Sequence, residues 1–238
     1  MIDRYLKSVS WISALALVAA CSGGDEAGTA GGSGAASGSG SGDVSGLAGL
    51  FGTGGGEDFS AADLPEGTGS EFVARLQEVG DRSEVFRSTL TSAPTVPTSG
   101  TATFSGTGGI ADVNIPQDAD TVPEIAGYAA VATRADASVD FGSGDFSARQ
   151  YDFLDIADAP VSGEVTYAGR IASSGVSDDT TVSGSIAGTA ISATGPDKAG
   201  GGYVGVADPL FLGFFTAVGS GGTYDGVELG GGFFAAED

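Results

Sequence analysis

Glycine is the feature that most constrains this fold, because 43 of the 238 residues are glycine. That share is too high for a helical protein, since each glycine inside a helix costs about 1 kcal/mol relative to alanine. No Gly-X-Y repeat is present, which excludes a collagen-like chain. Gly/Ser runs fill residues 21–58, whereas later glycines separate short apolar runs. The sequence therefore predicts a disordered tether over residues 21–58, followed by a domain built from short strands and glycine-rich turns.

From residue 99 onward the apolar residues recur with a period of two. Ala137, Val139 and Phe141 alternate with polar residues, and a turn at residues 142–145 follows them. This alternation is typical of a strand with one buried face. The expected strands cover residues 101–106, 128–134, 135–141, 146–153, 161–171, 180–192, 203–207, 211–218 and 227–235. We expect an all-β fold, an antiparallel barrel of about eight strands over residues 99–238.

A short helical lead-in is expected within residues 59–98. Ser70 is a suitable N-cap, Glu71 follows in the first turn, and apolar residues follow at helical spacing. Gly80 and Asp81 predict a break that divides the segment into two short helices. We expect this segment to brace the barrel.

The first 20 residues have the layout of a secretory signal peptide. Arg4 and Lys7 precede an apolar stretch that is too short to span a membrane and ends in Val-Ala-Ala before Cys21. This ending resembles the lipobox of bacterial lipoproteins, which implies cleavage before Cys21 and lipid attachment to it. Ser22 in the next position favours the outer membrane. Cys21 is also the single cysteine, so no disulfide can form within the chain.

The composition excludes several kinds of chemistry. The chain has no histidine, and its net charge is −22. Catalysis by a serine–histidine or cysteine–histidine pair is therefore excluded, and nucleic acid is repelled. Asp152, Asp155 and Asp158 recur at a spacing of three, and Asp178 precedes Asp179. These carboxylates could bind calcium, but no EF-hand or nonapeptide repeat frames them, so solvated acidic loops are the favoured interpretation. We predict no catalytic residue, metal site or resident cofactor.

Four segments resemble the C-terminal β-barrel domain of transferrin-binding protein B and related bacterial surface lipoproteins. They are Pro-Thr-Ser-Gly-Thr-Ala-Thr-Phe-Ser-Gly at residues 97–106, Val-Asp-Phe-Gly-Ser-Gly at 139–144, Val-Ser-Gly-Ser-Ile-Ala-Gly at 182–188 and Gly-Thr-Tyr-Asp-Gly-Val-Glu-Leu-Gly-Gly-Gly-Phe-Phe at 222–234. The last is the most specific, although Tyr224 lacks the preceding Phe of the family pattern. The resemblance covers a little over half of the chain.

The resemblance implies a binding module on the outer membrane, engaged in capture of a nutrient or an iron source rather than in catalysis. Tyr203, Leu210 and Phe211 are the candidate ligand-binding residues, and a core position is the competing interpretation for each. Single-barrel relatives include haem-capturing proteins, so haem is an alternative ligand; here it would need a tyrosine such as Tyr151, Tyr203 or Tyr224. A structural or adhesion lipoprotein of the envelope is the other alternative. The sequence leaves open the ligand and which side of the membrane the domain faces.

Overall fold

The computed structural model describes residues 65–89, 95–115, 121–125, 127–177, 179–205 and 208–238. The predicted signal peptide (residues 1–20), the lipid-attachment residue Cys21 and the tether (residues 21–58) lie outside the described residues. Within the described ranges, no helix combines the length and the apolar character needed to cross a membrane.

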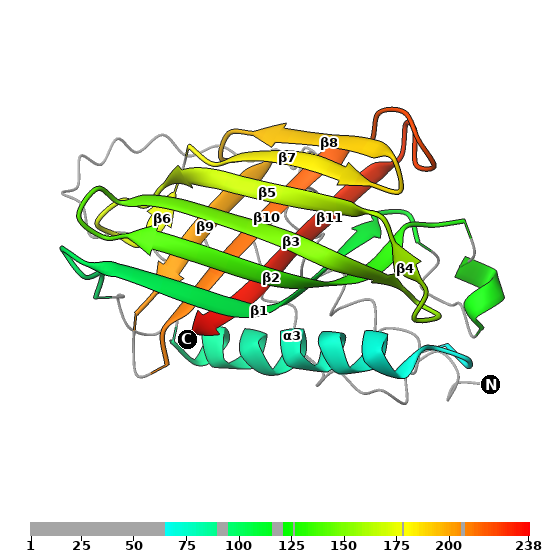
Figure 1. Cartoon of the computed structure of the whole chain (residues 1–238), viewed down its shortest axis with the longest axis horizontal. Helices are drawn as coiled ribbons and strands as arrows, with labels where there is room; N and C mark the ends of the chain where they lie inside the picture. Colours follow the sequence, from blue (N-terminus) through cyan, green and yellow to red (C-terminus); the bar gives the residue numbers. More distant parts are fainter. Residues whose placement is uncertain (1–64, 90–94, 116–120, 126, 178, 206–207) are drawn as a thin grey trace, which may run out of the picture.

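The described residues form one long helix and a single curled antiparallel sheet (Figure 1). The helical elements are α3 (Ser70–Thr89) and the short 3-10 helix η3 (Val122–Ile125). The strands are β1 (Thr101–Asp112), β2 (Ala130–Asp140), β3 (Asp145–Asp155), β4 (Pro160–Val161), β5 (Gly163–Arg170), β6 (Val176–Ser177), β7 (Thr181–Ile186), β8 (Thr189–Thr194), β9 (Ala199–Val204), β10 (Leu210–Val218) and β11 (Glu228–Glu237). They follow the order β6-β9-β10-β11-β1-β2-β3-β5-β7-β8, with β4 paired to β3.

The all-β antiparallel architecture with a preceding helix is confirmed, but its details differ from the prediction. The sheet has eleven strands instead of about eight, and it curls into an incompletely closed barrel. One predicted strand, residues 180–192, is a hairpin of β7 and β8, because Ala187 and Gly188 both have positive φ (49° and 77°). That is the conformation of a two-residue hairpin turn. Conversely, two predicted strands between residues 128 and 141 are the single strand β2.

The concave side of the curled sheet is filled by aromatic side chains. Their rings lie close together, with centroid distances of 5.0 Å for Phe146–Phe211 and 5.2 Å for Tyr167–Phe233. Glycine makes this packing possible: a Cβ on Gly213 would lie 2.5 Å from Cε1 of Phe233. The polar group Gln150 is also buried here, and its Nε2 donates to Thr133 Oγ1 and to the carbonyl of Gly232, both at 2.9 Å. The interior is therefore a packed core.

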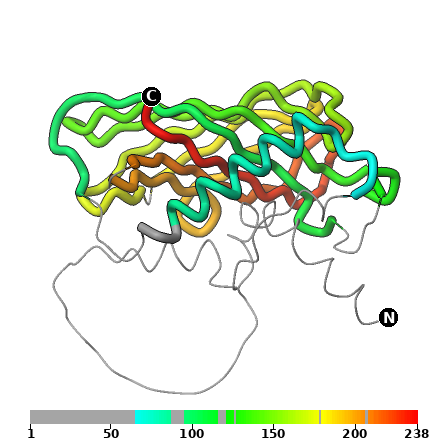
Figure 2. The backbone as a smooth tube through the Cα atoms, turned by 90° about the horizontal axis from the view of Figure 1, so that it is seen from below, coloured from blue at the N-terminus to red at the C-terminus, as the bar shows by residue number. Residues whose placement is uncertain are grey.

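Helix α3 lies along the outer face of the sheet, as both views show (Figures 1 and 2). At its N-terminal end Phe72 and Leu76 pack against Ala111 of β1 and Ala130 and Ala132 of β2, within a larger buried cluster. At its C-terminal end Val79 and Phe86 join a second cluster, which is formed with Val204, Leu210, Leu212, Phe214 and Phe234. The helix thus crosses the sheet from β2 toward β9 and β10.

The predicted break in the helix does not occur, and the predicted cap is wrong. The helix continues through Gly80 to Thr89, because burial of Phe86 against Phe234 offsets the roughly 1 kcal/mol cost of a helical glycine. The carbonyl of Gly69 already accepts a hydrogen bond from the amide of Val73, so Ser70 lies inside the helix. The cap comes instead from Asp158, whose carboxylate accepts from the amides of Glu71 (3.0 Å) and Phe72 (2.7 Å).

Two of the carboxylates predicted as solvated acidic loops, Asp152 and Asp158, are instead contacts between the helix and the sheet, and Asp178 lies outside the described residues. The buried guanidinium of Arg75 bonds the carboxylate of Asp152 at 2.7 Å and that of Glu71 at 3.2 Å, and it also donates to the carbonyl of Asp152. Arg134 reaches the same Asp152 carboxylate at 3.1 Å. Asp155 accepts from two amides of its own turn. No cluster of three or more potential metal ligands occurs among the residues that the structure describes.

Candidate functional site

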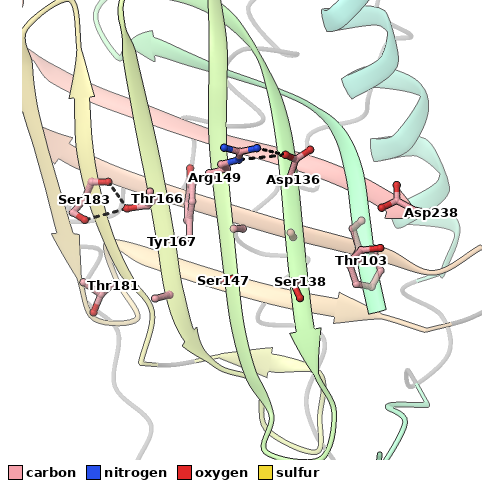
Figure 3. Close-up of a pocket in the computed structure, with 14 residues that line it drawn as sticks. Thr103, Asp136, Ser138, Ser147, Arg149, Thr166, Tyr167, Thr181, Ser183 and Asp238 are labelled. Carbon is pink, nitrogen blue, oxygen red and sulfur yellow. Dashed lines mark hydrogen bonds and ion pairs between the residues drawn. The ribbon is translucent and has the colours of Figure 1, made fainter. Parts of the chain in front are cut away.

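The candidate site is an open groove of about 810 Å³ on the outer face of β1, β2, β3, β5 and β7 (Figure 3). The polar side chains that line it alternate along each strand with core residues such as Ala102, Phe146 and Val182, so they lie on the face opposite the core. Four core residues, Phe104, Ala137, Ala148 and Tyr167, also border the groove. The polar lining residues are Thr103, Asp136, Ser138, Ser147, Arg149, Thr166, Thr181, Ser183 and Asp238.

Register brings these side chains into two rows that cross the strands. In one row Thr103 is opposite Ser138, and Ser138 is opposite Ser147. In the other row Asp136 is opposite Arg149, Arg149 is opposite Thr166, and Thr166 is opposite Ser183. Short hydroxyl side chains in adjacent strands leave space above the sheet that longer side chains would fill. The Thr166 hydroxyl reaches the carbonyl of Ser183 at 2.9 Å, so part of this lining is already fixed.

The groove cation Arg149 contacts Asp136 and Tyr151 and forms a longer ion pair with Glu164, 3.8 Å from Nη1. The guanidinium of Arg149 bonds the carboxylate of Asp136 at 2.9 Å and 3.2 Å and lies 4.5 Å from the ring centre of Tyr151. The hydrogen bond to Asp136 raises the pKa of Arg149 above its ordinary value. The hydroxyl of Tyr151 in turn donates to Asp136 at 3.1 Å. Arg149 is half-exposed, so it can turn its free N–H groups toward a ligand.

Asp238 provides a second carboxylate at the edge of the groove beside β1. Its backbone amide donates to the carbonyl of Thr103 at 3.0 Å. Hydrogen bonds from the hydroxyls of Ser105 and Thr103 lower the pKa of its side chain. The groove therefore presents hydroxyl donors and acceptors, the Arg149–Asp136 pair and a second carboxylate at its edge. Such a lining recognises polar groups by hydrogen bonding, and it has no nucleophile paired with a base for covalent catalysis.

The three residues proposed from the sequence as ligand contacts lie elsewhere. Tyr203, Leu210 and Phe211 are 5%, 2% and 0% exposed. Tyr203 packs edge-on against Phe141 with ring centres 5.0 Å apart, and Phe211 belongs to the same interior cluster. Leu210 lies on the outer face under helix α3. The structure thus places all three in packed cores, and none of them lines the groove.

The tyrosines considered for haem are poorly suited to it. Burial raises the pKa of Tyr203 and of Tyr224. Burial also raises the pKa of Tyr151, and the hydrogen bond to Asp136 adds to this shift. A phenol must lose its proton to become a tyrosinate ligand of ferric iron, and a raised pKa opposes that loss. The direction of the shift is therefore unfavourable at all three positions.

The groove residues gave little signal in the sequence. Each is a small polar residue at an outward strand position, and such positions are ordinarily solvated. Their alignment into rows depends on strand register, which the strand pattern alone does not give. The four segments with family resemblance do come together in space: they lie in β1, in the β2–β3 hairpin, in β7 with its turn, and in β11 with the loop before it. Four of these strands, β1, β2, β3 and β7, contribute lining residues.

Comparison with known proteins gives a match to solved structures alone. No protein family profile matches the chain, and no curated protein matches it either. Among solved structures, a double mutant of the vaccine antigen transferrin binding protein B from Haemophilus parasuis Hp5 is 19% identical over 59% of this chain and 26% of that one, with a TM-score of 0.35. Intact Ap-TbpB, with its N and C lobes, is 17% identical over 60% of this chain and 27% of that one, also with a TM-score of 0.35. The chain spans about a quarter of these proteins. It is similar to them at the level of the fold, and they are the proteins whose barrel the strand motifs resemble.

Proposed function

We propose that this chain is a lipid-anchored binding module of the bacterial outer membrane that holds its partner in the hydroxyl-lined groove. The observation that carries the proposal is the contrast between the two sides of the sheet. The concave side is filled by aromatic residues, whereas the outer side of β1, β2, β3, β5 and β7 has an open groove. Anchoring through Cys21 rests on the Val-Ala-Ala-Cys segment.

The partner is a macromolecule, by preference an iron-source protein outside the cell. Small-molecule sites are concave, mostly apolar and enclose most of their ligand. This groove is open, and its apolar lining residues are interspersed with six Ser and Thr hydroxyls and one Asp–Arg pair. It suits an extended polar segment that lies across the strands. Nutrient capture follows from the resemblance of the strand motifs, and the proteins compared above make transferrin the first partner to test.

The test is to fill the groove and measure binding. Ser147→Trp and Ser183→Trp place a large ring among the lining hydroxyls, and Ser162→Trp is the matched control, because Ser162 is exposed between β4 and β5, outside the groove. Immobilised lipoprotein would be exposed to transferrin and to host serum, and bound protein would be identified by mass spectrometry. We expect a bound protein that both groove variants lose and the control retains. Binding that survives both groove variants, or a properly folded protein with no partner, would favour a structural role in the envelope.

A further inference from the structure

The outer face of the sheet is buried over an area that helix α3 does not reach. Register aligns Thr216 of β10 with Gly230 of β11, and Gly230 with Ala111 of β1. At this level the helix packs on Ala111 and on residues of β2. Thr216 lies two strands further along and belongs to neither of the two clusters that include the helix, yet it is only 5% exposed.

The buried area is apolar and smooth. It comprises outward positions of β9, β10 and β11 to one side of the helix, namely Gly200, Thr216 and Gly230, together with Phe214 at the edge of the helix cluster, all of them buried. The ring of Phe214 lies over Gly200, where an added Cβ would come within 2.3 Å of Cε1. Thr216 Oγ1 is buried on this face without a hydrogen-bond partner. Buried hydroxyls are ordinarily paired, so an element that covers this face must offer a polar group as well as apolar side chains.

We propose that the apolar segment at residues 47–51 of the same chain packs on this outer face of β9, β10 and β11. Its sequence is Leu-Ala-Gly-Leu-Phe, within an otherwise Gly/Ser-rich region. Two leucines and a phenylalanine provide the apolar surface that the face requires. The glycine leaves backbone N–H and C=O groups accessible to Thr216. The apolar stretch of the predicted signal peptide is not a candidate for this position, because the proposed lipoprotein would lose it on cleavage before Cys21.

The reach of the chain permits this docking. The residues from 52 to 65 number 14 and can span about 46 Å when extended at about 3.3 Å per residue. Helix α3, with 20 residues, is about 30 Å long. The face lies two strands from Ala111, against which the N-terminal half of the helix packs, so the chain that precedes Pro65 is long enough to reach it. With residues 47–51 docked, the free tether from Cys21 shortens to about 25 residues, an r.m.s. span of roughly 25–30 Å. The docked segment would then set the distance between the barrel and the membrane.

Photocrosslinking in the full lipidated chain tests this placement. Phe51 is replaced by the photocrosslinker p-benzoylphenylalanine. In a control chain, Ser39 is replaced by the same residue. We expect an intramolecular crosslink from position 51 to peptides of β10 or β11, and none from position 39. A crosslink that joins two chains, one to other parts of the chain, or none at all overturns the proposal. Because no partner is present, this result is independent of whether the groove binds one.

A second measurement covers the case in which the bulky crosslinker prevents docking. Thr216→Cys supplies a thiol under the proposed segment, since acylation consumes the native Cys21. Adding Leu50→Ser and Phe51→Ser should speed maleimide labelling of that thiol by at least about tenfold, equivalent to about 1.4 kcal/mol of docking free energy. Val44→Ser is the control and should leave the rate unchanged. An equal rate with and without the Leu50 and Phe51 changes contradicts the proposal.

Discussion

The two halves of the curled sheet use their outer faces in opposite ways. In β9, β10 and β11 nearly every residue is buried, whichever face it is on. In β3, β5 and β8 buried and exposed residues alternate. Both halves share the same aromatic core on the inside. The difference shows that the outer face of one half is covered and that the outer face of the other half is open to solvent.

Truncating one outward residue in each half should give the largest difference. Phe214→Ala removes a buried ring and should cost about 3–5 kcal/mol of unfolding free energy. Ser147→Ala, at an outward position of the open half, should change it by less than about 0.5 kcal/mol. Urea unfolding followed by circular dichroism measures both. Similar losses for the two variants would break the distinction between the halves.

The next largest difference is expected between two ion pairs, that of Arg75 and that of Arg149, in the unfolding free energy that each contributes. Arg75 belongs to helix α3 and is buried against β3, with its side chain 6% exposed, whereas the groove residue Arg149 is 50% exposed. We expect Arg75→Met to cost about 2 kcal/mol, less than a fully buried pair, because Asp152 is half-exposed and keeps Arg134. Arg149→Met should cost at most about 1 kcal/mol. The same unfolding measurement applies, and an Arg149 variant as damaging as the Arg75 variant would contradict the assignment.

The cap that Asp158 forms on helix α3 should contribute less to the free energy of unfolding. Asp158→Ala removes the acceptor for two helix amides and should cost about 1 kcal/mol. Asp158→Asn is the matched control, because it keeps an acceptor oxygen and tolerates the positive φ of 63° at this position. Hydrogen exchange at the amides of Glu71 and Phe72 reports the change locally. Equal exchange in the alanine and asparagine variants would show that the cap does not stabilise the helix.

The smallest expected effect concerns pH at the β5–β6 corner. The backbone amide of Arg170 and the hydroxyl of Ser177 donate to Asp179 and lower its pKa below the ordinary 3.8. A carboxyl with a lowered pKa in the folded state stabilises the fold above its unfolded pKa and loses that contribution as the pH falls through the folded value. The gap in melting temperature between wild type and Asp179→Asn should therefore narrow below about pH 4. A gap that stays constant between pH 6 and pH 2.5 would contradict this.

The strand pattern predicted the fold class because period-two alternation is local to each strand. It misplaced the β7–β8 boundary, since Ala187 in a left-handed conformation carries no turn signature such as Asn-Gly. The capping of α3 could not be predicted either, because Asp158 lies 87 residues from the amide it caps. Tyr203, Leu210 and Phe211 were chosen for aromatic density, but a run buried on both faces of a covered strand has the same composition as an exposed patch. The groove itself depends on register between strands that are distant in sequence.

The most direct test of the central claim compares thiol accessibility in the two halves. Ser147→Cys places a thiol in the groove, and Thr216→Cys places one on the outer face of the covered half. Both are measured in the lipidated chain with the same maleimide under native conditions. The account predicts that Ser147→Cys reacts at least about tenfold faster than Thr216→Cys, and that the ratio falls toward one in denaturant, when local protection is lost. Equal native rates, or faster labelling of Thr216→Cys, would contradict it.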